Sequence, residues 1–218
     1  MKSKLAVGIS LLIIIISLSG CGESVEEKLY NKLEKTVEIE SESTETSKNI
    51  AELEIKDKEL LNEIADYTDK QLDEANKKSD EAIEINEKLK ESLQEEESKF
   101  AEAKSEFEKS ESLIDKLEEK NEEELGSEMY DVMIKRYETY DKLSEEYEVA
   151  INEKIEFYKL MKKEDTEEEP LLNQIEKINK HNEEIIELNT TINEYTEEYN
   201  ALKKELYEKM DLNIEYND

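Results

Sequence analysis

Residues 72–117 read LDEANKKSDEAIEINEKLKESLQEEESKFAEAKSEFEKSESLIDKL. Alternating steps of three and four residues along this stretch select fourteen positions, of which ten are apolar. The positions between them are almost all Glu, Lys, Asp and Ser, so the apolar side chains fall on one narrow stripe. The stretch therefore predicts a long α-helix that buries a coiled-coil seam. The fourteen positions are Leu72, Ala75, Ser79, Ala82, Asn86, Leu89, Leu93, Glu96, Phe100, Ala103, Phe107, Ser110, Ile114 and Leu117.

Similar stripes lie on both sides of this stretch. The one before it is a single residue out of step and comprises Ile50, Leu53, Asp57, Leu60, Ile64 and Tyr67. A third comprises Met129, Met133, Tyr140, Leu143, Tyr147, Ala150, Phe157 and Met161. The last comprises Leu171, Ile175, Ile178, Ile185, Leu188, Ile192, Tyr195, Tyr199, Leu202 and Leu206. Each stripe indicates a further long helix.

Turns are predicted near residues 67–71, 124–128 and 165–170. At the first, the register slips and Thr68 begins a capping-box pattern, although a continuous helix with a skip residue gives a similar pattern. At the second, Gly126 suits a helix end, and Ser127 after it suits an N-cap. At the third, Pro170 disfavours helix at Glu169 and suits a first helical turn. These turns divide the chain into separate helices.

The fold class is therefore all-α. We expect an elongated antiparallel helical bundle or coiled coil of three to four long helices over residues 25–210, with a frayed tail over 211–218. Residues 41–47 (SESTETS) contain no apolar side chain and are interpreted as a local break or a solvated turn. The heptads fit seams within one chain or between chains, so the oligomeric state stays open.

The composition excludes several classes of protein. The formal net charge is −31, so the chain has no surplus of cations to release counterions from phosphates, and nucleic acid is not an expected partner. Only 4 Gly and 1 Pro are present, which argues against a sheet-rich enzyme fold, because strands need turns. A single Cys rules out a disulfide framework and a Cys-based zinc site.

Residues 1–20 have the features of a secretory signal peptide. Lys2 and Lys4 precede an apolar run from Leu5 to Leu18, and small residues follow. The alternative is a transmembrane anchor, but at about 1.5 Å per residue the run spans roughly 21 Å, short of the ~30 Å hydrocarbon core. Removal of residues 1–20, which carry two Lys and no acid, takes the net charge from −31 to −33.

Leu18-Ser19-Gly20-Cys21 closely resembles the lipobox of bacterial lipoproteins. The resemblance implies recognition of these four residues by signal peptidase II and a thioether-linked diacylglycerol on Cys21. Further acylation, for example by palmitate, would strengthen the attachment, because two or three chains give durable anchoring where one is marginal. Residues 21–24 are then a lipidated N-terminus and short tether, on the extracellular face of the membrane. The alternative is an unmodified thiol close to the membrane.

The whole mature chain resembles the YkyA-like lipoproteins of low-GC Gram-positive bacteria, which have a proposed wall-binding role. Besides Cys21, the segments that carry the likeness are Lys99–Lys109 (KFAEAKSEFEK), Tyr130–Tyr147 (YDVMIKRYETYDKLSEEY) and Glu156–Asp165 (EFYKLMKKED). The resemblance implies an exported, membrane-tethered helical protein. It supplies no catalytic or ligand-binding residue.

Candidate chemistry is sparse, and we expect no enzyme. His181 is the single His and is interpreted as a solvated helix residue; its alternative, as a base or metal ligand, lacks recognisable partners in the sequence. Carboxylates are so numerous that no pair stands out as catalytic. No metal or cofactor motif is present.

Tyrosines are concentrated in the second half, where nine of the eleven follow Gly126. Such rings can be buried in a helix seam with a solvated hydroxyl. Alternatively, some remain exposed and form a binding surface for glycan or a partner helix. The candidates for that surface are Tyr130, Tyr137, Tyr140 and Tyr147.

The charge limits the partners of such a module. Wall teichoic acids and the membrane face are anionic, so binding to peptidoglycan or wall polymer needs divalent cations, aromatic–sugar contacts or a basic partner. We expect a structural or binding module of the cell envelope. The alternative is a coiled-coil adaptor that docks an envelope protein, such as a hydrolase or secretion factor.

Overall fold

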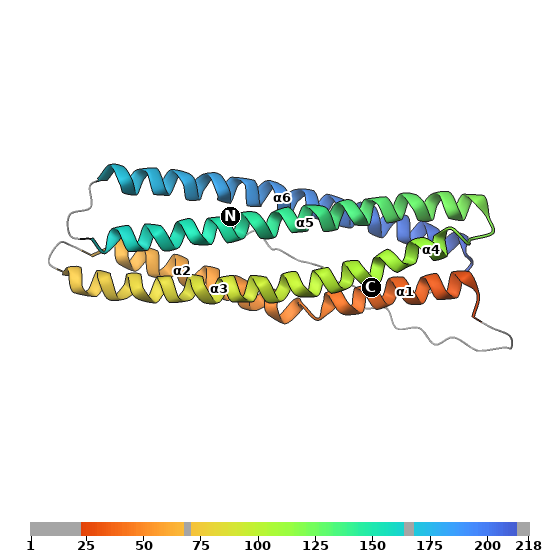
Figure 1. The fold of residues 1–218 in the computed structure, drawn as a ribbon, viewed down its shortest axis with the longest axis horizontal. Coiled ribbons are helices and arrows are strands. Elements are labelled where there is room, and N and C mark those ends of the chain that lie inside the picture. The colour runs from red at the N-terminus through yellow and green to blue at the C-terminus, as the bar shows by residue number, and fades with distance from the viewer. Residues whose placement is uncertain (1–22, 68–70, 164–167, 213–218) are drawn as a thin grey trace. The chain divides into compact units, whose positions relative to one another are not determined.

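The computed structural model describes residues 23–67, 71–163 and 168–212, and every regular element in these ranges is helical (Figure 1). This confirms the predicted all-α class, with four long helices. The elements are α1 (Val25–Ser41), α2 (Thr44–Ala65), α3 (Leu72–Phe107), the 3-10 turn η2 (Glu108–Ser110), α4 (Glu111–Ile114), α5 (Lys120–Met161) and α6 (Glu168–Lys209).

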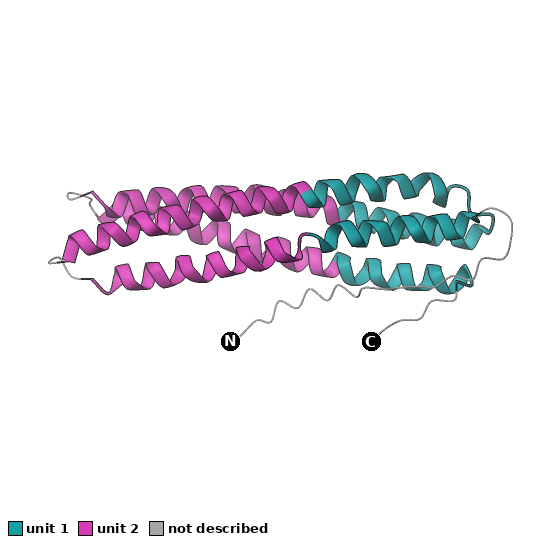
Figure 2. Ribbon diagram, turned by 90° about the horizontal axis from the view of Figure 1, so that it is seen from below, with its two compact units in different colours: residues 1–42, 99–135, 195–218 teal, residues 43–98, 136–194 magenta. Residues whose placement is uncertain are grey.

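The helices form two compact units (Figure 2). Unit 1 contains α1, the end of α3 from residue 99, η2, α4, the start of α5 up to residue 135, and the end of α6 from residue 195. Unit 2 contains α2 and the remaining parts of α3, α5 and α6. Among the described residues, α3, α5 and α6 therefore each contribute to both units, α1, η2 and α4 belong to unit 1, and α2 belongs to unit 2.

Cross-helix contacts fix the direction of neighbouring helices within each unit. In unit 2, Asn49 contacts Ser92 and Asn86 contacts Asp57, so positions rise along α2 as they fall along α3. Positions also rise along one helix as they fall along the other in the α5–α6 pair of unit 2 and in the α1–α6 pair of unit 1. These three pairs of helices are thus antiparallel, as predicted.

The seam periodicity of α3 identifies its buried face. From Ser79 onward, every predicted seam position is buried or half-buried, and Asn86 and Ser110 are fully buried. Leu72, predicted to open the seam, is instead 56% exposed. It is the first residue of α3, so its side chain lies at the helix end. The α6 stripe is less well covered, since Ile175 is 39% exposed.

The predicted turn at Gly126 is wrong. Gly126 and Ser127 lie inside α5, which begins at Lys120, and the preceding helix α4 ends at Ile114. A Cβ added at Gly126 would lie 3.0 Å from Cγ2 of Ile114. The glycine therefore allows close packing of α4 against α5 and does not end a helix.

The other predicted breaks fall at helix boundaries. α1 ends at Ser41 and α2 begins at Thr44, so 41–47 contains a local break. α2 ends at Ala65 before the expected turn at 67–71, of which residues 68–70 lie outside the described residues. In the 165–170 segment, residues 164–167 lie outside them too, and α6 begins at Glu168. Glu169 is helical, contrary to the expectation, because Pro170 lies in the first turn, where its missing N–H has no intrahelical partner to lose.

The end of α6 continues into an ordered turn. Asp211 has a φ of 53°, and the N–H of Leu212 donates to the carbonyl of Tyr207 at 3.3 Å. The N–H of Asp211 donates to the carbonyl of Glu208, which completes a Schellman motif. The frayed tail predicted over 211–218 is therefore wrong for residues 211 and 212; residues 213–218 lie outside the described part.

The core of unit 1 contains two groups of aromatic rings. The Phe107 ring is fully buried, stacks on Tyr130 with ring centroids 5.2 Å apart and meets Tyr199 edge-on at 6.0 Å. Tyr30 and Tyr207 form a second pair at 5.2 Å. Aromatic pairs contribute about 0.5–1.5 kcal/mol beyond their area burial.

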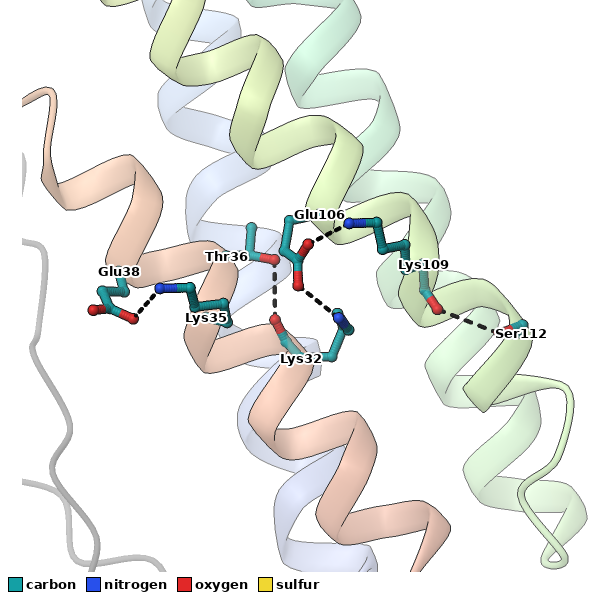
Figure 3. A network of polar contacts seen from close by, with 7 residues as sticks. All are labelled: Lys32, Lys35, Thr36, Glu38, Glu106, Lys109 and Ser112. Atoms are coloured by element: carbon teal, nitrogen blue, oxygen red, sulfur yellow. Dashed lines mark hydrogen bonds and ion pairs between the residues drawn. The ribbon is translucent and has the colours of Figure 1, made fainter.

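A carboxylate at the edge of this core joins α1 to α3. Glu106 accepts from Nζ of Lys32 at 2.5 Å and from Nζ of Lys109 at 2.6 Å (Figure 3). Both hydrogen bonds lower the pKa of Glu106, and the one from Lys109 has the larger effect. Lys32 is on α1 and Glu106 on α3, so the ion pair links these two helices.

Candidate functional site

The four tyrosines proposed as a binding surface do not form an exposed cluster. Tyr137 is 1% exposed and Tyr140 is 8% exposed, while Tyr130 and Tyr147 are half-buried. The Tyr130 ring stacks on Phe107, and the Tyr140 hydroxyl donates to Glu96 at 2.9 Å. The alternative of exposed rings is therefore wrong for Tyr137 and Tyr140, which are buried between helices.

A polar cluster lies inside unit 2, around the carboxylate of Asp57 on α2. Asp57 is 4% exposed and accepts hydrogen bonds from Asn86 of α3 at 2.5 Å and from the Tyr158 hydroxyl of α5 at 2.8 Å. Nζ of Lys154 lies 3.2 Å from its other oxygen. One carboxylate thus binds donors from two other helices.

Apolar side chains surround this cluster. One group contains Leu60, Ile64, Ala82, Ile85, Phe157 and Tyr158, and another contains Ile50, Leu89, Leu93 and Ile151. A buried carboxylate is strongly destabilising unless it is paired and hydrogen-bonded. Shifting any one helix along its axis would remove a donor from Asp57, so the cluster favours a single register of α2, α3 and α5.

Burial and neighbouring carboxylates raise the pKa of two phenols in unit 2. Burial, followed by the negative charge of Asp57, raises the pKa of Tyr158. Burial and the Glu96 carboxylate raise the pKa of Tyr140, and burial raises that of Glu54. The Tyr158 and Tyr140 hydroxyls therefore act as hydrogen-bond donors, to Asp57 and Glu96 respectively, which is a structural role.

A second polar group lies at the α5–α6 contact of unit 2. Nδ1 of His181 lies 2.7 Å from Oε2 of Glu146, and the two side chains are 20% and 27% exposed. Glu184, one turn after His181, also faces this contact. The sequence predicted that His181 is a solvated residue without partners. The structure shows instead that it contacts Glu146. The sequence contained no signal for this pair, because its two members are 35 residues apart.

Part of α6 presents apolar side chains to solvent. Leu172 is 56% exposed and Ile186 is 65% exposed, on the helix that also carries the exposed Ile175. The remaining site residues expected from the sequence, Leu18, Ser19, Gly20 and Cys21, lie outside the described residues. Within the described part, no helix is both long enough and apolar enough to cross a membrane.

Comparison with known proteins gives a family match and a related lipoprotein. A family model described as "YkyA: Putative cell-wall binding lipoprotein" matches residues 24–209. The chain is 29% identical over 192 residues to the "Uncharacterized lipoprotein YkyA" of Bacillus subtilis (strain 168), covering 88% of this chain and 86% of that protein.

The fold is similar to that of a solved structure. The 1.6 Å crystal structure of a conserved protein of unknown function from Staphylococcus aureus matches with a TM-score of 0.75 and 16% sequence identity. The match covers 87% of this chain and 97% of that chain. At this identity the likeness concerns the fold alone.

Proposed function

Because the chain belongs to the YkyA family, we propose that it is a membrane-anchored lipoprotein of the extracellular face whose helical part is a non-enzymatic binding module for the cell wall. The observation that carries the proposal is the extent of the family match. It spans residues 24–209, begins three residues after Cys21 and includes every helix from α1 to α6.

In this proposal, lipid on Cys21 is the membrane anchor. The side chain of Ser24 accepts from the N–H of Glu27 at 3.1 Å, and Glu27 accepts from the N–H of Ser24 at 2.9 Å, so a capping box starts α1. Three residues of fully extended chain span at most roughly 11 Å. The first turn of α1 would therefore be held close to the lipid headgroups.

The charge of the chain favours a cation-dependent mode of wall binding. A mature charge of −33 repels anionic wall polymer within a Debye length of about 8–10 Å. Burial of Tyr137 and Tyr140 leaves less ring surface for stacking on sugars. Divalent cations that bridge exposed carboxylates to polymer phosphates are therefore the favoured contact, at weak affinity for each bridge.

Lipidation is tested by metabolic labelling with palmitate. We expect the wild-type chain to take up label and to fractionate with membranes, and Cys21→Ala to lose both properties. Ser24→Ala is the matched control, because it weakens the cap of α1 by about 1 kcal/mol but leaves Leu18 to Cys21 unchanged. Equal labelling of the wild type and Cys21→Ala would overturn the anchor.

Wall association is tested by sedimentation of the mature protein with purified sacculi, with and without teichoic acid. We expect cosedimentation in Mg²⁺ and its loss in EDTA. Absence of sedimentation under every condition would overturn the proposal. If crosslinking in cells recovers one envelope protein and no wall fragments, the adaptor function is supported in place of wall binding.

A further inference from the structure

Three side chains that commonly bind metal ions meet at the α5–α6 contact of unit 2. They are Glu146 of α5 with His181 and Glu184 of α6, and one potential ligand atom from each lies within 4.8 Å of the other two. The 2.7 Å contact joins Nδ1 of His181 to Glu146. All three residues are half-buried, so solvent reaches the group while the helices restrict its movement.

The two helices hold these side chains in a fixed register. His181 and Glu184 are three residues apart, so they lie on the same face of α6. Two turns away, Nε2 of Gln174 donates to the backbone carbonyl of Glu153 at 2.9 Å and to the Glu153 carboxylate. Gln174 is 6% exposed. This buried contact prevents α6 from sliding along α5, which would separate His181 from Glu146.

One imidazole nitrogen and two carboxylate oxygens form a donor set that suits a borderline divalent transition metal. Zn²⁺ sites with three protein ligands commonly use such donors and keep a fourth position for water. Ca²⁺ instead requires about six to eight oxygen ligands. Ligand distances of about 2.0–2.2 Å place tetrahedral donor atoms roughly 3.3 Å apart. To bind one ion, Glu184 must therefore approach from within 4.8 Å, and the 2.7 Å contact between His181 and Glu146 must open slightly.

We propose that Glu146, His181 and Glu184 form a binding site for one Zn²⁺-like ion, which links α5 to α6. Lys180 competes for this site, because its Nζ lies 3.8 Å from Oε1 of Glu184. Metal binding would replace that exposed ion pair. The site does not depend on wall association, and its test needs only the purified protein.

The test is titration of the mature protein, carrying Cys21→Ser, with Zn²⁺ by calorimetry and with Co²⁺ by visible absorption. We expect one tight equivalent, a Co²⁺ spectrum typical of four-coordinate N/O ligands, and retention of Zn²⁺ in excess Mg²⁺. His181→Ala and Glu184→Gln should each weaken binding by at least about tenfold, because even groups behind the ligands contribute about 10–100-fold.

Two further variants separate this site from diffuse binding to carboxylates. Glu183→Gln removes an exposed acid next to Glu184 and should leave the affinity unchanged, whereas Lys180→Ala should raise it. Helicity measured by circular dichroism confirms that each variant is folded. Many weak equivalents that are insensitive to His181→Ala, or equal losses for Glu183→Gln and Glu184→Gln, would overturn the proposal.

Discussion

The two units bury different kinds of side chain. Among the described residues, buried polar or charged residues of unit 1 are Thr36 and Ser110, whereas those of unit 2 are Ser43, Asp57, Ser79, Asn86, Ser92, Arg136, Thr139 and Gln174. The core of unit 1 combines aliphatic side chains with aromatic contacts around Phe107 and Tyr207. Unit 1 thus obtains stability from apolar packing, and unit 2 exchanges some of that packing for a defined helix register.

Among the variants that test this contrast, Asp57→Ala should cause the largest loss of stability. It leaves the donors of Asn86, Tyr158 and Lys154 without their acceptor, and breaking a buried pair costs about 3–5 kcal/mol. We expect the free energy of unfolding to fall by an amount near the lower end of this range, because Lys154 is 23% exposed and reaches water. Urea unfolding measures the loss, and hydrogen exchange should rise more in residues 43–98 than in 99–135.

Glu63→Ala is the matched control, because Glu63 lies on the same helix but forms an exposed ion pair with Lys78. Such pairs contribute about 0–1 kcal/mol. Similar losses for Asp57→Ala and Glu63→Ala would show that the polar cluster has no special role in unit 2.

Alkaline pH should destabilise both units through their buried phenols. Burial, followed by the charge of Glu34, raises the pKa of Tyr30 in unit 1 to about 12, against 10.0 for the free side chain. Between these values the unfolded chain has lost the proton that the folded chain keeps, so the free energy of unfolding falls as pH rises. The pKa of Tyr158 in unit 2 is raised by burial and by Asp57.

The comparison uses Tyr30→Phe and Tyr158→Phe, with stability measured between about pH 8 and about pH 11. Each variant should lose less stability over this range than the wild type. Parallel curves for all three proteins would contradict the assignment.

Gly126→Ala tests close packing in unit 1. The added Cβ would lie 3.0 Å from Ile114, and overpacking costs about 1–3 kcal/mol, against about 1 kcal/mol gained in helix propensity. We expect a net loss of about 1 kcal/mol by urea unfolding. In the Ile114→Ala background the same change should become stabilising, whereas a loss of equal size in both backgrounds would exclude this contact as the cause.

The smallest effect is expected for Asp211→Gly, at the end of α6 in unit 1. Asp211 adopts a φ of 53°, a conformation that glycine adopts without strain, so the change should raise thermal stability by up to about 1 kcal/mol. Asp211→Ala should lower it. A Gly variant less stable than wild type would show that the Asp211 side chain contributes to the Schellman turn.

The seam positions of α3 were largely predictable, because helical periodicity fixes which face is buried whatever the side chain. The same pattern placed Asp57 and Asn86 on the seams although both are polar. It did not predict that they bind each other, since contacts between helices depend on the axial offset of two helices. His181 and Glu146 escaped prediction for the same reason. Gly126 was misread because a glycine either ends a helix or permits close packing, and its sequence context fits both.

The Asp57 cluster has a consequence for the order of folding. Its donor Asn86 is 29 residues away along the chain, but Lys154 and Tyr158 are 97 and 101 residues away. In a chain that emerges N-terminus first, α2 and α3 are complete long before α5 arrives. Until then Asp57 has only one of its donors, so its carboxylate stays solvated. We therefore expect α2 to pack against α5 late in folding, because contacts between distant residues form only after the loop-closure entropy has been overcome. Asp57 variants should therefore change the unfolding rate more than the folding rate.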